Sequence, residues 1–199
     1  MARPALDFWL EYASTYSYIA AERIGALARD AGVTVRWRPF LLGPIFQAQG
    51  WNTSPFNIYP GKGRYMWRDM ERICQSLGLP LKRLELFPQN SILAARVALI
   101  GFGEGWGEEF SRAVYRAEFG EARNIGDATV IAGILEGLKR DAKDVIERAQ
   151  AADNKARLRS ETEEAQRLGI FGAPSFITSD GELFWGNDRL EAALAWAKR

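Results

Sequence analysis

The sequence predicts an α/β fold in which a small mixed β-sheet is interrupted by a large block of helices. Alternating apolar and polar residues run over 7–12 and 33–42 near the N-terminus, and strand patterns return in a hairpin after Gly169. Between these regions, from about residue 64 to residue 168, apolar residues recur at helical spacing. A doubly wound sheet would need more parallel strands than this pattern supplies.

The first strand runs directly into a helix. Residues 7–12 alternate large apolar side chains with charged ones, which is typical of a buried or half-buried strand. The period then changes to three and four residues, so we expect a helix over about 15–31, capped by Ser14 or Thr15 and ended near Gly32. Its unpaired N–H groups and positive dipole end favour an anion beside Ser14.

The second strand and the segment after it differ sharply in character. Residues 33–42 alternate like a strand, which Pro39 ends, and the usual right-handed crossover makes this strand parallel to the first. Residues 43–63 hold four glycines and three prolines among polar and aromatic residues. We expect a long functional loop or a mobile lid there.

The helical block predicts several helices of different burial. The helix over 64–77 is amphipathic and carries Cys74 on its apolar face, and the next, capped by Asn90 or Ser91, is apolar nearly all round. Further helices are expected from about Gly105, from Asp127, over 141–151 and over 154–168. The charged runs of the last two are typical of solvated faces.

The C-terminal region completes the sheet. Residues 175–178 and 183–185 form a predicted hairpin, and Gly186, Asn187 and Asp188 are expected to cap a final helix. The order strand, helix, strand, helical insertion, hairpin, helix is that of a thioredoxin-like sheet. We therefore predict one discontinuous domain, made of residues 1–42 and 170–199, and a helical insertion over 43–169.

Composition limits the chemistry. The 199 residues include 26 Lys and Arg and 25 Asp and Glu, so the net charge of +1 attracts neither nucleic acid nor an acidic membrane. No window reaches the roughly 18 apolar residues of a membrane helix, and no leader pattern begins the chain, so we expect a soluble, cytoplasmic protein. The absence of histidine removes the usual general base and zinc ligand, and no carboxylate cluster has metal-ligand spacing. We expect no metal.

The single cysteine, Cys74, cannot form an internal disulfide or a CxxC pair. Its place on an apolar helical face favours a buried, inert thiol. If the protein is an enzyme working near neutral pH, its reactive group is therefore expected to arrive with a cosubstrate.

Several segments carry a resemblance to a known family. Thioredoxin folds present a CxxC at the first helix N-terminus, facing a cis-proline, and here these places hold Ser14-Thr15-Tyr16-Ser17 and Gly172-Ala173-Pro174-Ser175-Phe176. With DFWLEYASTYSYIA, LLGPIFQAQGWN, YPGKGRYMWRDMER and WGNDRL, the chain over about residues 6–198 resembles the DsbA-related family of kappa-class glutathione transferases and 2-hydroxychromene-2-carboxylate isomerases. The segment FWGNDRL is especially similar to the isomerase branch.

The resemblance implies a bound glutathione whose sulfur lies beside Ser14. Without a histidine a serine cannot readily become an alkoxide, but it can donate a hydrogen bond. A free thiol titrates near pH ~8.5, and a helix N-terminus with one good donor can make its thiolate abundant at neutral pH. The family commonly has proline where this chain has Thr15, so either hydroxyl is a candidate for facing the sulfur.

The resemblance also implies the rest of the glutathione site. Pro174 would be cis, and the backbone of Ala173, where the family usually has valine, would pair with the cysteinyl unit. Asn187 and Asp188 resemble the pair that receives the γ-glutamyl end, and Trp185 belongs to the same segment.

The implied reaction is glutathione-dependent isomerisation of an aromatic hydroxychromene carboxylate to an open-chain benzylidenepyruvate. Lys62 matches a family lysine near the glycyl end or the acidic substrate, and Asn52 matches a polar loop contact. A flat aromatic substrate would lie against a wall of further residues. The expected pocket residues are Trp37, Phe46, Trp51, Phe56, Tyr65 and Asn90.

Two alternatives stay open. A kappa-like transferase or peroxidase would use the same glutathione site but consume the thiol. A non-catalytic thioredoxin-like binding module would keep the fold and lack the site. The resemblance further implies a homodimer.

Overall fold

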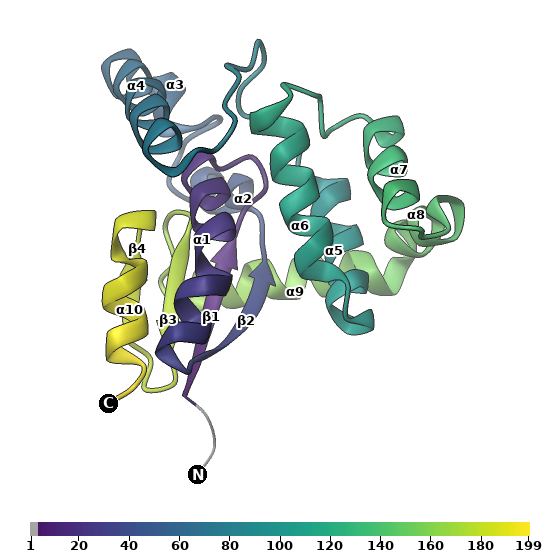
Figure 1. Ribbon diagram of the computed structural model, residues 1–199. Coiled ribbons are helices and arrows are strands. Elements are labelled where there is room, and N and C mark those ends of the chain that lie inside the picture. The colour runs from purple at the N-terminus through teal and green to yellow at the C-terminus, as the bar shows by residue number, and fades with distance from the viewer. Residues whose placement is uncertain (1–3) are drawn as a thin grey trace.

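The computed structural model describes residues 4–199 and contains a four-stranded mixed sheet in the order β2-β1-β3-β4 (Figure 1). β1 (Ala5–Leu10) pairs parallel with β2 (Thr34–Pro39) and antiparallel with β3 (Ser175–Thr178). β3 also pairs antiparallel with β4 (Leu183–Trp185). The predicted thioredoxin-like sheet, its parallel pair and its hairpin are confirmed.

Both faces of the sheet are covered. Side chains alternate along β1 and point into a different cluster of buried residues on each face. Leu6 and Phe8 point into one cluster of buried side chains, which includes residues of α1 (Thr15–Ala31) and α10 (Leu190–Trp196). Trp9 points into a second cluster, which α2 (Leu42–Ala48) and α9 (Ala152–Arg167) complete. β1 is therefore buried on both sides, and the chain that leaves its C-terminal end is held in a fixed position.

α1 begins and ends as predicted. Ser14 is its N-cap, and the Ser14 Oγ accepts a hydrogen bond from the backbone N–H of Ser17 at 3.3 Å. Gly32 ends the helix at a φ of 69°, a left-handed conformation that glycine adopts without a steric penalty. The first strand begins and ends two residues earlier than predicted, so it stops at Leu10 and leaves Glu11 and Tyr12 in the turn before the helix.

The prediction of a long loop over 43–63 is wrong. This segment forms most of α2, then α3 (Pro55–Ile58) and the first turn of α4 (Pro60–Leu77). All three prolines lie in first turns, where the missing N–H would have no partner within the helix in any case. Lys62 consequently lies on a helix rather than in a loop.

The helical block continues with α5 (Ile92–Glu104), α6 (Gly107–Tyr115), a π-helical turn η1 (Arg116–Gly120), α7 (Ala128–Gly137) and α8 (Ala142–Gln150). Figure 1 shows α5 to α8 grouped beside the sheet, while α3 and α4 lie beyond the N-terminal end of α1. Asp127 caps α7 as predicted. The π-helical turn gave no signal in the sequence.

Of two predicted caps, the one before α5 is confirmed at Asn90 and the one before α10 is not found. At α5, Ser91 occupies the N-cap position but makes no capping bond, and Asn90 Oδ1 instead accepts from the N–H of Ile92 at 3.0 Å. At the C-terminus, a 3-10 turn η2 (Asn187–Arg189) precedes α10, and residues 186–188 provide no side-chain cap to it. None of the helices formed by residues 4–199 is both long and apolar enough to cross a membrane.

Candidate functional site

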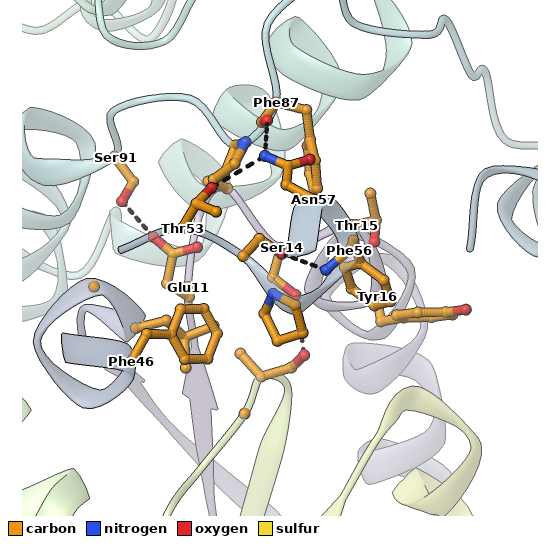
Figure 2. A pocket seen from close by; sticks show the side chains of 18 of the residues that line it. Glu11, Ser14, Thr15, Tyr16, Phe46, Thr53, Phe56, Asn57, Phe87 and Ser91 are labelled. Carbon is orange, nitrogen blue, oxygen red and sulfur yellow. Dashed lines mark hydrogen bonds between the residues drawn. The ribbon is translucent and has the colours of Figure 1, made fainter. Parts of the chain in front are cut away.

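A cavity of about 1570 Å³ opens where the C-terminal end of β1 meets the N-terminal end of α1 (Figure 2). One side is formed by the segment from α2 to α4 and by the loop before α5. The other side is formed by the loop that precedes β3 and by residues 185–188. The cavity is therefore bounded by segments that lie far apart in the sequence.

Ser14 connects two sides of this cavity. Besides accepting from Ser17, its Oγ donates a hydrogen bond to the backbone oxygen of Ala173 at 3.0 Å. The Ala173–Pro174 peptide bond is cis, as the resemblance implied. A polar group at the N-terminus of α1 thus faces the proline loop directly, and α1 has no acidic residue in its first turn that would repel an anion.

Thr15 is placed differently from Ser14. Its side chain is buried, and its Oγ1 has no hydrogen-bond partner among residues 4–199. Ser14 is the residue that caps α1 and reaches the proline loop. This geometry favours Ser14 over Thr15 as the hydroxyl that faces a ligand.

Glu11 also lines the cavity, and it was not among the predicted site residues. It is only 6% exposed, and the hydroxyl of Ser91 donates a hydrogen bond to its carboxyl group. Burial raises the pKa of Glu11 to about 7, while hydrogen bonds from Ser91 and the backbone of Ala13 partly oppose the rise. The sequence pattern treats Glu11 as a polar strand position, but the strand has ended by this residue. The one feature of the sequence that could have pointed to Glu11 is a charged residue between large apolar residues, three positions before the helix cap.

The predicted aromatic wall is present in part. Phe46, Trp51, Phe56 and Tyr65 line the cavity, and the rings of Phe46 and Trp51 pack with centroids 5.8 Å apart. Trp37 does not line it. Its alternation on β2 points it into the core, where it is buried against Phe8 at a centroid distance of 4.8 Å and against Phe102 at 6.1 Å.

The polar residues predicted for the substrate pocket and its loop also line the cavity. Asn52, Lys62 and Asn90 are lining residues, and the Lys62 Nζ lies 4.9 Å from the centre of the Tyr59 ring. Tyr16, which was not predicted, also lines the cavity and donates a hydrogen bond to Asp69 at 3.0 Å.

The opposite rim carries residues from both ends of the hairpin. Ala173, Trp185, Asn187 and Asp188 line the cavity, whereas the predicted Pro174 is not a lining residue. The ring of Trp185 lies against Gly172, where a Cβ would come within 2.4 Å of its Nε1.

A second residue of this rim is fixed in position. Asn187 is buried, and its Oδ1 accepts from the Nη1 of Arg23 at 2.8 Å. Its side-chain amide is thereby oriented while its neighbour Asp188 stays exposed.

No other reactive group stands out in the described part of the chain. Within residues 4–199 no three His, Cys, Asp or Glu side chains are grouped so that they could hold a metal ion. Cys74 is buried on α4, as predicted, and burial raises the pKa of its thiol to about 11. A nucleophile at this cavity is therefore expected from a bound molecule.

The fold and the cavity define the class of protein. Residues 5–195 match the model of the DSBA-like thioredoxin domain, and the chain belongs to this family.

Among its relatives, the chain is 30% identical over 188 residues to a 2-hydroxychromene-2-carboxylate isomerase of Sphingobium xenophagum, covering 94% of both chains. It is 24% identical over 205 residues to glutathione S-transferase kappa 2 of Caenorhabditis elegans, covering 94% of this chain and 89% of the relative. A solved structure of 2-hydroxychromene-2-carboxylate isomerase superposes with a TM-score of 0.85 at 28% identity, covering 98% of this chain and 96% of that one.

Proposed function

We propose that the protein is a glutathione-dependent isomerase that interconverts 2-hydroxychromene-2-carboxylate-type compounds and trans-o-hydroxybenzylidenepyruvate. The observation that carries the proposal is the position of Ser14, whose hydroxyl lies at the N-terminus of α1 and faces the proline loop across the cavity. The similarity to isomerases over nearly the whole chain supports the same reaction.

The residues of the cavity fit glutathione. The Ser14 hydroxyl can turn its proton from the Ala173 oxygen to a sulfur atom, and the N-terminal dipole of α1 stabilises negative charge there. Asp188 offers a carboxylate to the ammonium of the γ-glutamyl end, beside the oriented amide of Asn187. The backbone of Ala173 offers polar groups to the cysteinyl unit. Trp185 and Asn52 would enclose the peptide.

The cavity also has room for a second, flat molecule. The aromatic side chains of Phe46, Trp51, Phe56 and Tyr65 form an apolar surface on one side of it. Lys62 supplies a positive charge on the same side, suited to the carboxylate of the substrate, and Asn90 a further polar contact.

Bound glutathione would supply a thiolate that adds reversibly to a conjugated carbon of the substrate, so that the double bond becomes single and can rotate. The protein's part is then to stabilise the thiolate through Ser14, to orient the substrate through Lys62 and the aromatic wall, and to exclude water. The thiol is regenerated, and no oxidation or reduction takes place.

The alternative function is that of a kappa-like transferase or peroxidase. The similarity to the Caenorhabditis elegans transferase favours it, because such an enzyme would use the same glutathione site and consume the thiol. A homodimer and a cytoplasmic location stay predictions under either function.

A direct assay separates the possibilities. We expect the purified protein to convert ring-closed 2-hydroxychromene-2-carboxylate to the trans open-chain compound only when glutathione is present, with no net loss of thiol. Consumption of the thiol with an aryl halide or a hydroperoxide, without isomerisation, would favour the transferase or peroxidase. Calorimetry that detects no glutathione binding would contradict both and leave a binding module.

A further inference from the structure

The buried Glu11 has no role in the thiolate chemistry, although its carboxyl group faces the cavity. Of the charged residues that line this cavity within residues 4–199, Glu11 alone is more than nine-tenths buried. Lys62, Asp69 and Asp188 are the others. A carboxyl group is costly to bury without a partner of opposite charge, so its presence at a cavity wall points to chemistry.

Glu11 is held rigidly next to Ser14. The backbone N–H of Ser14 donates to the backbone oxygen of Glu11 at 3.1 Å, and the Tyr115 hydroxyl donates to the same oxygen at 3.0 Å. In the view of Figure 2, Glu11 lies beside Ser91 at one side of the pocket, Tyr16 and Phe56 lie at the other, and Ser14 lies between them. The backbone of Glu11 is thus fixed relative to the proposed sulfur position.

The carboxyl group faces the part of the cavity left for the substrate. The proposed glutathione contacts at residues 173 and 185–188 lie on the opposite rim, whereas Ser91, which holds Glu11, begins the α5 side. Ser91 donates to the Oε1 of Glu11, whereas Oε2 has no side-chain partner among the described residues and can carry the proton of the acid form. One carboxylic acid group then presents a donor and an acceptor side by side.

We propose that Glu11 is the proton-transfer group for opening the hemiketal ring of the substrate, an inference that rests on the proposed function. The ring-closed substrate carries a hydroxyl and a ring oxygen on one carbon, and their spacing matches the two oxygens of a carboxyl group. Glu11 gives its proton to the ring oxygen as the bond between that oxygen and the carbon breaks. The hydroxyl oxygen forms the ketone, and its proton passes to the other oxygen of Glu11.

This step balances without a further reactant. One O–H bond of Glu11 and one of the substrate break, a phenol O–H and a new Glu11 O–H form, and the electron pair of the broken C–O bond stays on the phenol oxygen. No electron is lost or gained. The protonated acid is restored after each turnover, and the step precedes any contact with the thiolate.

The surroundings of Glu11 keep the acid form available near neutral pH. Glu118 of η1 and Tyr115 of α6 approach it from the neighbouring elements, Tyr12 precedes the same turn, and no cation contributes to its pKa shift among the described residues. Desolvation by burial is the largest cause of the raised pKa. Ring opening should therefore slow as the pH rises through about 7, where Glu11 ionises.

The test uses the full chain without glutathione. Exchange between ring-closed 2-hydroxychromene-2-carboxylate and its cis open-chain form is followed by NMR for the wild type and for Glu11→Gln. We expect the wild type to accelerate the exchange and Glu11→Gln to lose about 100-fold or more of that rate, as is typical when general acid–base catalysis is removed. Glutathione binding measured by calorimetry should not change. The control Glu104→Gln removes a surface carboxylate of α5 and should match the wild type.

A second variant separates chemistry from a structural effect. Ser91→Ala removes a hydrogen bond that favours the ionised form, so it should raise the pKa of Glu11 in a carbon-13 NMR titration and move the loss of ring opening to higher pH by the same amount. Equal exchange rates in wild type and Glu11→Gln would overturn the proposal. So would a Ser91→Ala protein in which the pKa of Glu11 rises but the pH dependence of ring opening stays unchanged. Ring opening without any glutathione-dependent isomerisation would refute the proposed function alone.

Discussion

At Ser14, one side chain makes two contacts of different kinds. Its oxygen accepts an N–H from the first turn of α1, and its proton goes to the backbone oxygen of Ala173. A thiolate beside it would be a better acceptor than a neutral carbonyl group, because hydrogen bonds to charged groups are stronger. Ser14 should therefore lower the pKa of a bound thiol without being needed to bind the tripeptide.

Replacing Ser14 with alanine tests this role. A hydrogen bond to a charged group contributes about 1.5–3 kcal/mol, so Ser14→Ala should raise the pKa of bound glutathione by about 1–2 units. Isomerase activity at neutral pH should fall by about 10- to 100-fold, while calorimetry still detects glutathione binding. The ultraviolet absorbance of the thiolate, titrated against pH, gives the shift directly.

Thr15→Val is the matched control for this substitution. It removes the neighbouring hydroxyl, which has no partner in the described part of the chain, and keeps the shape of the side chain. The pKa of bound glutathione should not change. A shift in Thr15→Val, together with none in Ser14→Ala, would assign the sulfur contact to Thr15 instead.

Most of the predicted site residues line the cavity, and Trp37 and Glu11 show where prediction from the sequence failed. Trp37 is an aromatic residue in a suitable stretch of sequence, but the register of β2 directs it into the core. Glu11 is polar in a strand-like pattern, and only the early end of β1 turns it into the cavity. The direction of a side chain depends on where a strand stops, which a periodic pattern does not define to the residue.

At the level of elements, the π-helical turn η1 contains a buried carboxyl group. Glu118 lies within it, is fully buried, and neither of its carboxyl oxygens has a hydrogen-bond partner among residues 4–199. Burial, and in second place the charge of Glu11, raises the pKa of Glu118 well above its ordinary value of 4.5. The folded protein therefore keeps Glu118 protonated where the unfolded chain ionises it.

This predicts a specific dependence of stability on pH. A raised pKa in the folded state means that the contribution of Glu118 is fully present below about pH 4.5 and is lost as the pH rises above it. Relative to wild type, Glu118→Gln should gain stability progressively as the pH rises above about 4.5, because the glutamine has no proton to lose in the unfolded chain. Urea unfolding of both proteins between pH 4 and pH ~8 measures the difference. A difference in unfolding free energy between the two proteins that stays constant across that range would contradict the prediction. It would show that Glu118 ionises in the folded protein as it does in the unfolded chain.

The short helices α2 and α3 show the limit of reading glycine and proline as loop signals. The same prolines that indicate a loop are also favoured in the first turn of a helix. Packing decides between the two readings: Ile45 of α2 is buried with Trp9 and Ala165, and the Ser54 hydroxyl accepts the N–H of Phe56 at the start of α3. The wall of the cavity is consequently helical, with Lys62 on its third element.

For the whole molecule, one hydrophobic core joins the sheet to the helical block. The same cluster of buried side chains includes Leu6 and Phe8 of β1, Val97 of α5 and Leu135 of α7. The predicted division into a discontinuous thioredoxin-like domain and an insertion over 43–169 is based on the order of elements in the sequence. The buried side chains of the two parts nevertheless pack against each other in one cluster. The division itself stays a prediction.

Shared packing predicts shared unfolding. We expect urea to unfold the protein in a single transition, with tryptophan fluorescence and far-ultraviolet circular dichroism giving the same midpoint, because neither part can keep its buried side chains covered alone. Two separate midpoints would show instead that the helical insertion is an independent folding unit.

The sequence by itself determined the order of the strands, the thioredoxin-like sheet, the resemblance to its family and a helix cap at Ser14 or Thr15, because these depend on local periodicity, turn chemistry and short motifs. Only the tertiary structure decided that Ser14 caps α1, that Glu11 lines the cavity, that Trp37 does not and that residues 43–63 are mostly helical. Each of these follows from contacts between segments that are distant in the chain, and such contacts override local preference.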